Sequence, residues 1–219
     1  MLDAATRAFT VVDLCISISE VMAAPGAITL RNLSGVWGVN RALSDNPEPC
    51  YKLQGMPWVL RKFLSHLTIT NRVSQTTDER GCTRIKISST MSGGFDFDID
   101  PYILDGLEYS TAQGTQRVRA QWVDLGCSKL TSGGGGGGLI DHYLTQDWLE
   151  DSNATTWDHV YVHIVNERGG WTAEYVWGFV ERSGARRFVK KVLMRKGDFF
   201  IRMAIVHDWN GPLPNSNCA

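Results

Sequence analysis

The histidines of this chain do not form a metal motif. His159 and His163 have the i, i+4 spacing that places two zinc ligands on one face of a helix. The residues around them alternate instead as in a β-strand, on which that spacing separates the side chains by about 13 Å. The sequence also contains no Gly-x-Ser-x-Gly elbow. We therefore expect neither a metal site nor a serine nucleophile.

A single lysine lies on an otherwise apolar strand face. Residues 186–194 predict a strand, and Lys190 shares one of its faces with Phe188, Val192 and Met194. The ammonium group then either extends to the rim of the sheet or serves as the cation of a binding site. The sequence leaves both interpretations open.

Aromatic residues are concentrated on one face of another predicted strand. Tyr175, Trp177 and Phe179 share that face, and Gly178 on the opposite face would leave room for a ligand. Trp122, on a different predicted strand, is a further candidate for a cavity wall. Eight tryptophans are many for a chain of 219 residues. They either fill an ordinary β-rich core or line a cavity for a flat apolar ligand.

Three carboxylates alternate with apolar side chains in the segment FDFDID. Asp96, Asp98 and Asp100 share one strand face, opposite two phenylalanines and an isoleucine. The carboxylates form a solvated surface if the aromatic face points inward, and they line the cavity in the opposite case.

The elements that must position these residues are short strands. We predict them over residues 36–41, 67–73, 83–88, 95–100, 107–109, 116–123, 159–165, 172–180, 186–194 and 199–206. After the first strand, residues 42–50 predict a loop, and residues 56–66 predict a helix that would plug one end of a barrel. About nine or ten strands with short turns suffice for a single all-β, antiparallel barrel.

A Gly-x-Trp segment opens this series of strands. Gly35 lacks a Cβ that would clash at the turn, and Trp37 would bury a large apolar ring at the closed end of the barrel. Arg202, on the last predicted strand, could lie flat on this indole. We expect that contact to close the barrel.

Composition excludes several classes of function. With 22 Lys and Arg against 23 Asp and Glu, there is no broad field for nucleic acid or an anionic membrane, and no apolar run is long enough for a membrane span. Five cysteines without a Cys-x-x-Cys pair indicate free thiols. The six glycines of residues 133–138 are more typical of a flexible insertion than of a phosphate loop.

The chain divides into three parts. Residues 1–30 form a loosely ordered leader, residues 31–210 form the barrel with a Gly-rich loop at 131–139, and residues 211–219 form a tail. Acidic residues interrupt the leader, which favours a loosely attached segment, or a start at Met22, over a signal peptide. We therefore expect a cytoplasmic protein.

Four segments resemble a group of small fungal lipocalin-like proteins, some of which belong to secondary metabolism. They are residues 32–37 (NLSGVW), 43–45 (LSD), 53–62 (LQGMPWVLRK) and 170–179 (GWTAEYVWGF). The resemblance runs from about Asn32 to Trp209 and does not include the leader or the six-glycine tract. Within this group, the chain is similar to the hetero-Diels–Alderases of tropolone–sesquiterpenoid biosynthesis.

The resemblance implies a concrete reaction. A tropolone with a benzylic hydroxyl loses water to give an o-quinone methide, which adds as a heterodiene to one alkene of humulene or a related sesquiterpene. This reaction requires two apolar partners held face to face, exclusion of water and a donor to the oxygen that gains negative charge. The implied partners are small hydrophobic substrates, with no cofactor, nucleic acid or membrane span. A homodimer is left open.

No catalytic motif of the family carries over to this chain, so we assign the roles of particular residues in this reaction from their own chemistry. The candidates for substrate binding are polar or aromatic: Gln54, Trp58, Trp122, Trp177 and Phe179. Lys190 or Gln54 would donate to the substrate oxygen, and Asp100 or His163 would serve as the acid–base group for the dehydration. Two other functions stay open, a passive carrier of a hydrophobic metabolite and a dehydratase or isomerase with the same cavity.

Overall fold

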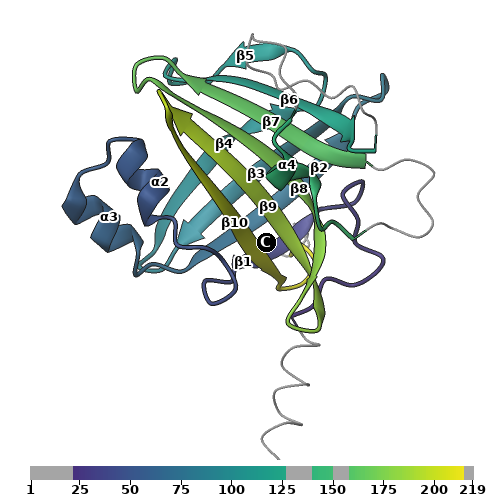
Figure 1. Ribbon diagram of the computed structural model, residues 1–219. Coiled ribbons are helices and arrows are strands. Elements are labelled where there is room, and N and C mark those ends of the chain that lie inside the picture. Colours follow the sequence, from purple (N-terminus) through teal and green to yellow (C-terminus); the bar gives the residue numbers. More distant parts are fainter. Residues whose placement is uncertain (1–21, 127–139, 150–157, 215–219) are drawn as a thin grey trace, which may run out of the picture.

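A computed structural model describes residues 22–126, 140–149 and 158–214 of the chain. Within these ranges, ten antiparallel strands form one sheet in the order β4-β3-β2-β1-β10-β9-β8-β7-β6-β5 (Figure 1). The strands are β1 (Gly35–Val39), β2 (Ile69–Thr77), β3 (Thr83–Met91), β4 (Phe95–Ile103), β5 (Glu108–Ser110), β6 (Arg117–Asp124), β7 (Asp158–Asn166), β8 (Trp171–Arg182), β9 (Ala185–Lys196) and β10 (Phe199–Trp209). The helices are α2 (Glu48–Leu53), α3 (Trp58–Leu64) and α4 (His142–Thr145).

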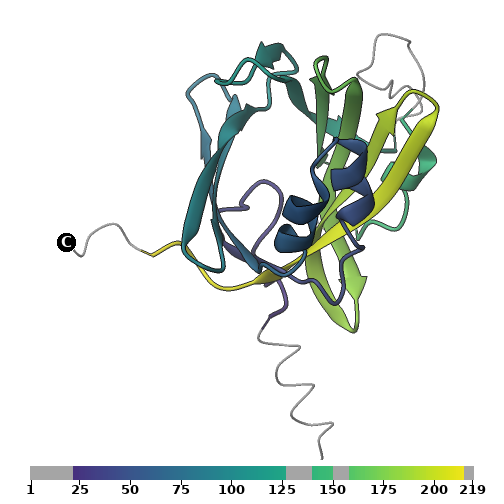
Figure 2. The same ribbon diagram turned by 90° about the vertical axis from the view of Figure 1, so that its left-hand side faces the viewer.

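The sheet curls into a barrel in which the first and last strands are neighbours (Figures 1 and 2). Trp37 on β1 lies opposite Trp209 on β10. The edge strands β4 and β5 form no ladder with each other, but Tyr109 on β5 donates a hydrogen bond of 2.8 Å to the carbonyl of Pro101 on β4. The predicted all-β, antiparallel, lipocalin-like (calycin-type) barrel is confirmed, with a seam between these two strands.

Aromatic packing closes one end of the barrel. Trp37 is fully buried, and its Nε1 donates a hydrogen bond of 3.0 Å to the carbonyl of Leu33. Its ring centroid lies 4.8 Å from that of Trp209 and 5.1 Å from that of Phe188. A Cβ at Gly35 would lie only 2.1 Å from Cζ3 of Trp209, so this close approach requires glycine.

The predicted contact between Arg202 and Trp37 is wrong. Successive side chains on a strand point to opposite faces, and Met203 belongs to the interior cluster, so Arg202 points outward. Its guanidinium binds Oδ2 of Asp141, just before α4, at 2.9 Å. The closing contact to Trp37 is made instead by an aromatic ring of the same strand, Trp209.

Residues 22–34 cover the closed end of the barrel. The carbonyl of Arg186 accepts a hydrogen bond of 2.8 Å from the backbone nitrogen of Ala24, and the Arg186 guanidinium donates to two carbonyls of this segment at 2.8 and 3.1 Å. The side-chain oxygen of Gln75 on β2 accepts a further hydrogen bond of 2.9 Å from the backbone nitrogen of Leu33 in this segment. Residues 22–30, which we assigned to a loosely ordered leader, thus pack against the barrel.

Two short helices, not one, follow β1. The loop predicted over residues 42–50 ends in α2, and a turn at Gly55 with φ of 82° separates α2 from α3. The helix predicted over residues 56–66 is found as α3, in which Val59 and Phe63 are 70% and 49% exposed while Leu64 lines a cavity of the barrel. Both helices lie at one end of the barrel, between the β2–β4 wall and the β8–β10 wall (Figure 2).

The outer face of β8 is covered by the chain itself. A Cβ at Gly178 would lie 2.4 Å from Cε3 of Trp148, so the space that we predicted for a ligand is occupied by this indole. The backbone nitrogen of Leu149 donates a hydrogen bond of 2.8 Å to the carbonyl of Phe179, which holds the segment after α4 against the strand. Gly178 therefore allows the indole of Trp148 to pack closely against the outer face of β8.

We expect Gly178→Ala to lower the free energy of unfolding by about 1–3 kcal/mol, because the added methyl group overpacks the contact with Trp148. Thermal denaturation followed by circular dichroism measures this loss. Gly26→Ala, where a Cβ meets nothing within 4 Å, is the matched control. In a Trp148→Ala background the cost of Gly178→Ala should largely disappear, and an unchanged cost would contradict the proposed contact.

Candidate active site

A cavity of about 440 Å³ occupies the half of the barrel that the aromatic cluster leaves open. This volume falls within the range of about 300–1,000 Å³ that is common for small-molecule sites. Most of its walls are apolar, and they include Ile69, Phe97, Ile99, Met203 and Ile205. Its exposed rim comes from the loop after β1.

Lys190 lies on the floor of this cavity. The register of the sheet places it directly opposite Trp177 on β8, and its Nζ lies 4.1 Å from the centroid of that ring. It forms no ion pair with any residue in the described part of the chain. Burial lowers the pKa of the Lys190 amine to about 7. The amine is therefore poised between its neutral and charged forms at physiological pH.

Two further polar side chains lie beside Lys190 in the cavity lining. Burial, together with the charge of Lys190, lowers the pKa of His207 to about 3, so this imidazole is neutral. The ring of Tyr102 stands perpendicular to that of Trp177, with centroids 5.2 Å apart. Burial raises the pKa of Tyr102, so its hydroxyl stays protonated and serves as a donor. The floor thus combines one titratable amine with neutral polar groups.

A β-bulge brings Tyr102 into the cavity. Ile99 faces the interior opposite Ile87, and simple alternation would next turn residue 101 inward. The register shifts between Ile85 and Ile87, so that Tyr102 pairs with Ile85 and points into the barrel. We did not select this residue from the sequence, although Pro101 next to it is a signal, because proline within a sheet is confined to edges and bulges.

Asn71 and Ser89 add a polar spot to the opposite wall. They are a cross-strand pair of β2 and β3, both buried, and Ser89 Oγ donates a hydrogen bond of 2.7 Å to Asn71 Oδ1. We did not select these two residues or His207 from the sequence. A signal was present, since each is a polar residue on an otherwise apolar strand face.

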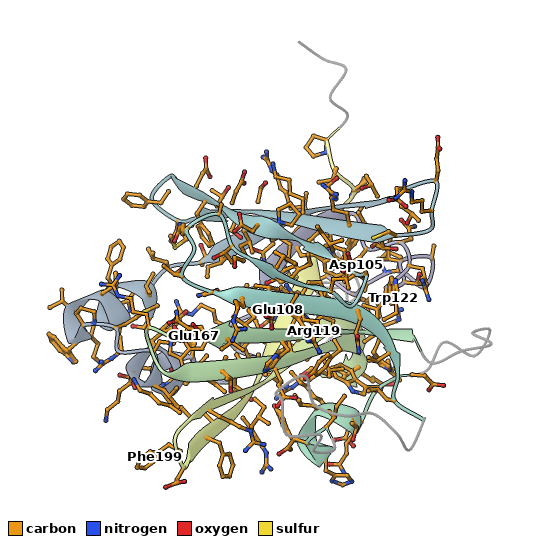
Figure 3. The ribbon with its side chains drawn as sticks, turned by 90° about the horizontal axis from the view of Figure 1, so that it is seen from above. Asp105, Glu108, Arg119, Trp122, Glu167 and Phe199 are labelled. Atoms are coloured by element: carbon orange, nitrogen blue, oxygen red, sulfur yellow. The ribbon has the colours of Figure 1, made fainter. Side chains whose placement is uncertain are left out.

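The structure brings together two of the predicted site residues, Lys190 and Trp177. Phe179 also faces the interior but lies deeper, under the guanidinium of Arg186 at 3.6 Å from its ring centroid, and it does not line the cavity. Trp122 on β6 (Figure 3) is covered by Arg31, whose Cζ lies 3.8 Å from its ring centroid. The segment that closes the barrel thus occupies the space next to Trp122.

Gln54 and Trp58 lie outside the cavity lining. Gln54 caps the C-terminal end of α2, and Trp58 begins α3 with its ring exposed. The structure therefore does not place either side chain against the cavity floor. Among the described residues, the hydrogen-bond donors on the floor include Lys190, Tyr102 and the indole nitrogen of Trp177, which has no hydrogen-bond partner there.

The two residues predicted for acid–base chemistry lie away from the cavity. Asp100 accepts a hydrogen bond of 2.7 Å from the backbone of Ala112. His163 points to the outer face of β7, next to Arg119, which lies opposite Glu108 of β5 (Figure 3). Burial and the charge of Arg119 lower the pKa of His163. Strand alternation separates both side chains from the floor.

The described residues contain no group of three or more His, Cys, Asp or Glu residues that could hold a metal ion. Cys50 and Cys82, the cysteines within the described ranges, are both free. None of the helices in these ranges has the length and apolar character needed to cross a membrane. The six-glycine tract lies outside the described residues.

The strand order and the internal cavity define a lipocalin-type barrel. No family model matches the chain. The chain is 30% identical over 198 residues to Pericyclase pydY of an Acremonium species, covering 87% of this chain and 98% of that protein. It is 25% identical over 194 residues to Probable pericyclase scpY of Mollisia scopiformis, covering 87% and 96%. The chain therefore belongs to the family of pericyclase pydY. The tropolone–sesquiterpenoid subgroup stays a prediction.

Among solved structures, the chain is similar to a fatty acid-binding protein from the brain of Drosophila melanogaster, with a TM-score of 0.44 and 12% identity over 79% of this chain and 95% of that one. It is also similar to a mutant of the fluorescent protein UnaG, with a TM-score of 0.47 and 14% identity over 83% and 98%.

The burial of Lys190 should make stability depend on pH. The folded pKa of about 7 lies below the ordinary value of 10.5, so the unfolded chain binds more protons between these values and the free energy of unfolding rises with pH there. We expect Lys190→Met to raise Tm at pH 6 by several degrees, because the variant removes an ammonium group whose burial opposes folding at that pH. The gain should fade by pH 10. Equal Tm differences at both pH values in thermal denaturation would contradict this explanation.

Proposed function

We propose that this protein is a cofactor-free pericyclase that catalyses an intermolecular hetero-Diels–Alder cycloaddition. Its substrates would be a tropolone o-quinone methide and a humulene-type sesquiterpene of fungal secondary metabolism. The observation that carries the proposal is the pair of donors, Lys190 and Tyr102, on the floor of an apolar cavity in a member of the pydY family. The tropolone and the sesquiterpene come from the sequence resemblance.

The cavity has the properties that such a cycloaddition requires. The heterodiene gains negative charge on its oxygen in the transition state, and a donor fixed at that position lowers the barrier. Lys190 and Tyr102 flank Trp177, whose ring offers a flat surface for the conjugated diene. The aliphatic walls suit a hydrocarbon, and holding both partners together removes much of the entropic cost of their encounter.

The preceding dehydration also needs a proton donor. When the benzylic hydroxyl leaves, it takes up a proton and departs as water, while the ring hydroxyl loses its proton and becomes the carbonyl of the quinone methide. Asp100 and His163 do not line the cavity. The ammonium of Lys190 is therefore the donor that we assign to this step, with Tyr102 beside it.

Purified protein incubated with a hydroxymethyl tropolone precursor and humulene should form a single stereoisomer of the adduct faster than buffer does. Chiral chromatography measures both yield and stereochemistry. Tyr102→Phe and Lys190→Met should each lower the rate by about 100–1,000-fold, the range that loss of one fixed donor costs. Lys86→Met, which removes the same charge from an exposed position on the outer face, should not.

Yield and stereochemistry equal to those of the protein-free reaction would reject the proposal. Tight binding of the precursor or of humulene without any effect on the product would instead identify a carrier of a hydrophobic metabolite. Release of the quinone methide without cycloaddition would identify a dehydratase.

A further inference from the structure

The charge balance of the cavity points to the form in which its polar substrate binds. Among the lining residues the only carboxylate is that of Asp45, which is exposed at the rim and accepts a hydrogen bond of 2.7 Å from the backbone of Ala204. Within the ranges that the structure describes, Lys190 on the floor has no carboxylate partner. An ammonium group in apolar surroundings is unfavourable unless an anion accompanies it.

The other ionisable groups facing the cavity do not supply that anion. His207 on β10 is neutral, and the pKa values of Tyr102 on β4 and Tyr175 on β8 are raised by burial, the latter to about 12. Burial also raises the pKa of Tyr51 on α2. Arg41 at the rim is a second cation, and it donates to a backbone carbonyl at 3.1 Å. Among the described residues that face the cavity none supplies an anion to the floor, so an anion that stabilises the protonated amine comes from the ligand.

We propose that the cavity binds its polar substrate as the ionised form of an acidic enol, with the anionic oxygen next to Nζ of Lys190. For a tropolone this form is the tropolonate. The inference rests on the proposed function for the identity of the substrate, but it concerns binding and is tested without turnover. It restricts the polar partner to compounds with an ionisable oxygen and leaves the apolar walls to the hydrocarbon.

This binding mode couples recognition to the dehydration. In a bound tropolonate with a benzylic hydroxyl, an electron pair of the ionised ring oxygen forms the carbonyl while the benzylic C–O bond breaks. The departing hydroxide takes a proton from the ammonium of Lys190. The products are the o-quinone methide, one water molecule and the neutral amine, so the step needs no further reactant.

Proton uptake on binding is the measurement that tests the inference. With a pKa of about 7, the amine is only about one-tenth protonated at pH 8, and an anion beside it raises the pKa so that a proton is taken up. Calorimetric titration of tropolone at pH 8, in buffers of different ionisation enthalpy, should give close to one proton taken up per ligand. The methyl ether of tropolone, which cannot ionise, should bind at least tenfold more weakly and without proton uptake.

Substitutions of Lys190 distinguish the effect of its charge on tropolone binding from the effect of its size. Lys190→Met should abolish proton uptake and lower the affinity for tropolone at least tenfold. Lys190→Arg keeps a permanent positive charge, so it should retain binding but show no proton uptake at pH 8. Lys86→Met, exposed on the outer face of β3, should behave as the unmodified protein.

Three results would overturn the inference: no binding of tropolone, equal affinity for tropolone and its methyl ether, or binding without proton uptake by the unmodified protein. The last two results are measured on the unmodified protein, so they test the inference even if Lys190→Met fails to fold. Proton-linked binding without catalysed cycloaddition would reject the proposed function alone, whereas catalysis without proton-linked binding would reject this inference alone.

Discussion

Packing around Phe188 sets the boundary between core and cavity in this barrel. Its ring contacts Trp37 and Trp177, with centroids 5.1 and 6.1 Å apart, and this cluster fills the closed half. Lys190 is the next residue of β9 that faces inward, because side chains on a strand return to the same face every second residue. Lys190 therefore lies at the boundary on β9 between the packed aromatic cluster and the cavity. The position of the amine follows from the extent of the aromatic packing.

This arrangement explains how one charged group can serve chemistry between apolar molecules. The amine rests on the face of Trp177, where the ring stabilises its charged form, while burial favours its neutral form. The neighbouring His207 and Tyr102 stay neutral and keep the floor polar without competing for an anion. Most of the remaining wall is apolar, apart from the pair Asn71 and Ser89 and the polar rim. The site thus places one titratable amine, that of Lys190, where a substrate oxygen would lie.

Much of the fold could be predicted from the sequence, because the two faces of a strand correspond to the alternation of polar and apolar residues along the chain. This reasoning placed Lys190 on an apolar strand face and Trp177 on an aromatic one, and both side chains line the cavity. The same rule, applied without a register, led to His163 and Asp100 as acid–base candidates, although neither lines the cavity. Trp122 has the predicted inward orientation, but Arg31 from a distant part of the chain covers it.

The sequence by itself determined an antiparallel all-β barrel, the two faces of each main strand and the presence of a lysine on an otherwise apolar face. Only the tertiary structure decided how far along the barrel each inward residue lies and whether it meets a cavity or a neighbour. Alternation with a period of two residues specifies on which face of the sheet a side chain lies, but it does not specify the position of that side chain along the barrel axis. A β-bulge changes even the face. For this reason Tyr102 became visible only in the folded chain, where the bulge turns it toward Trp177.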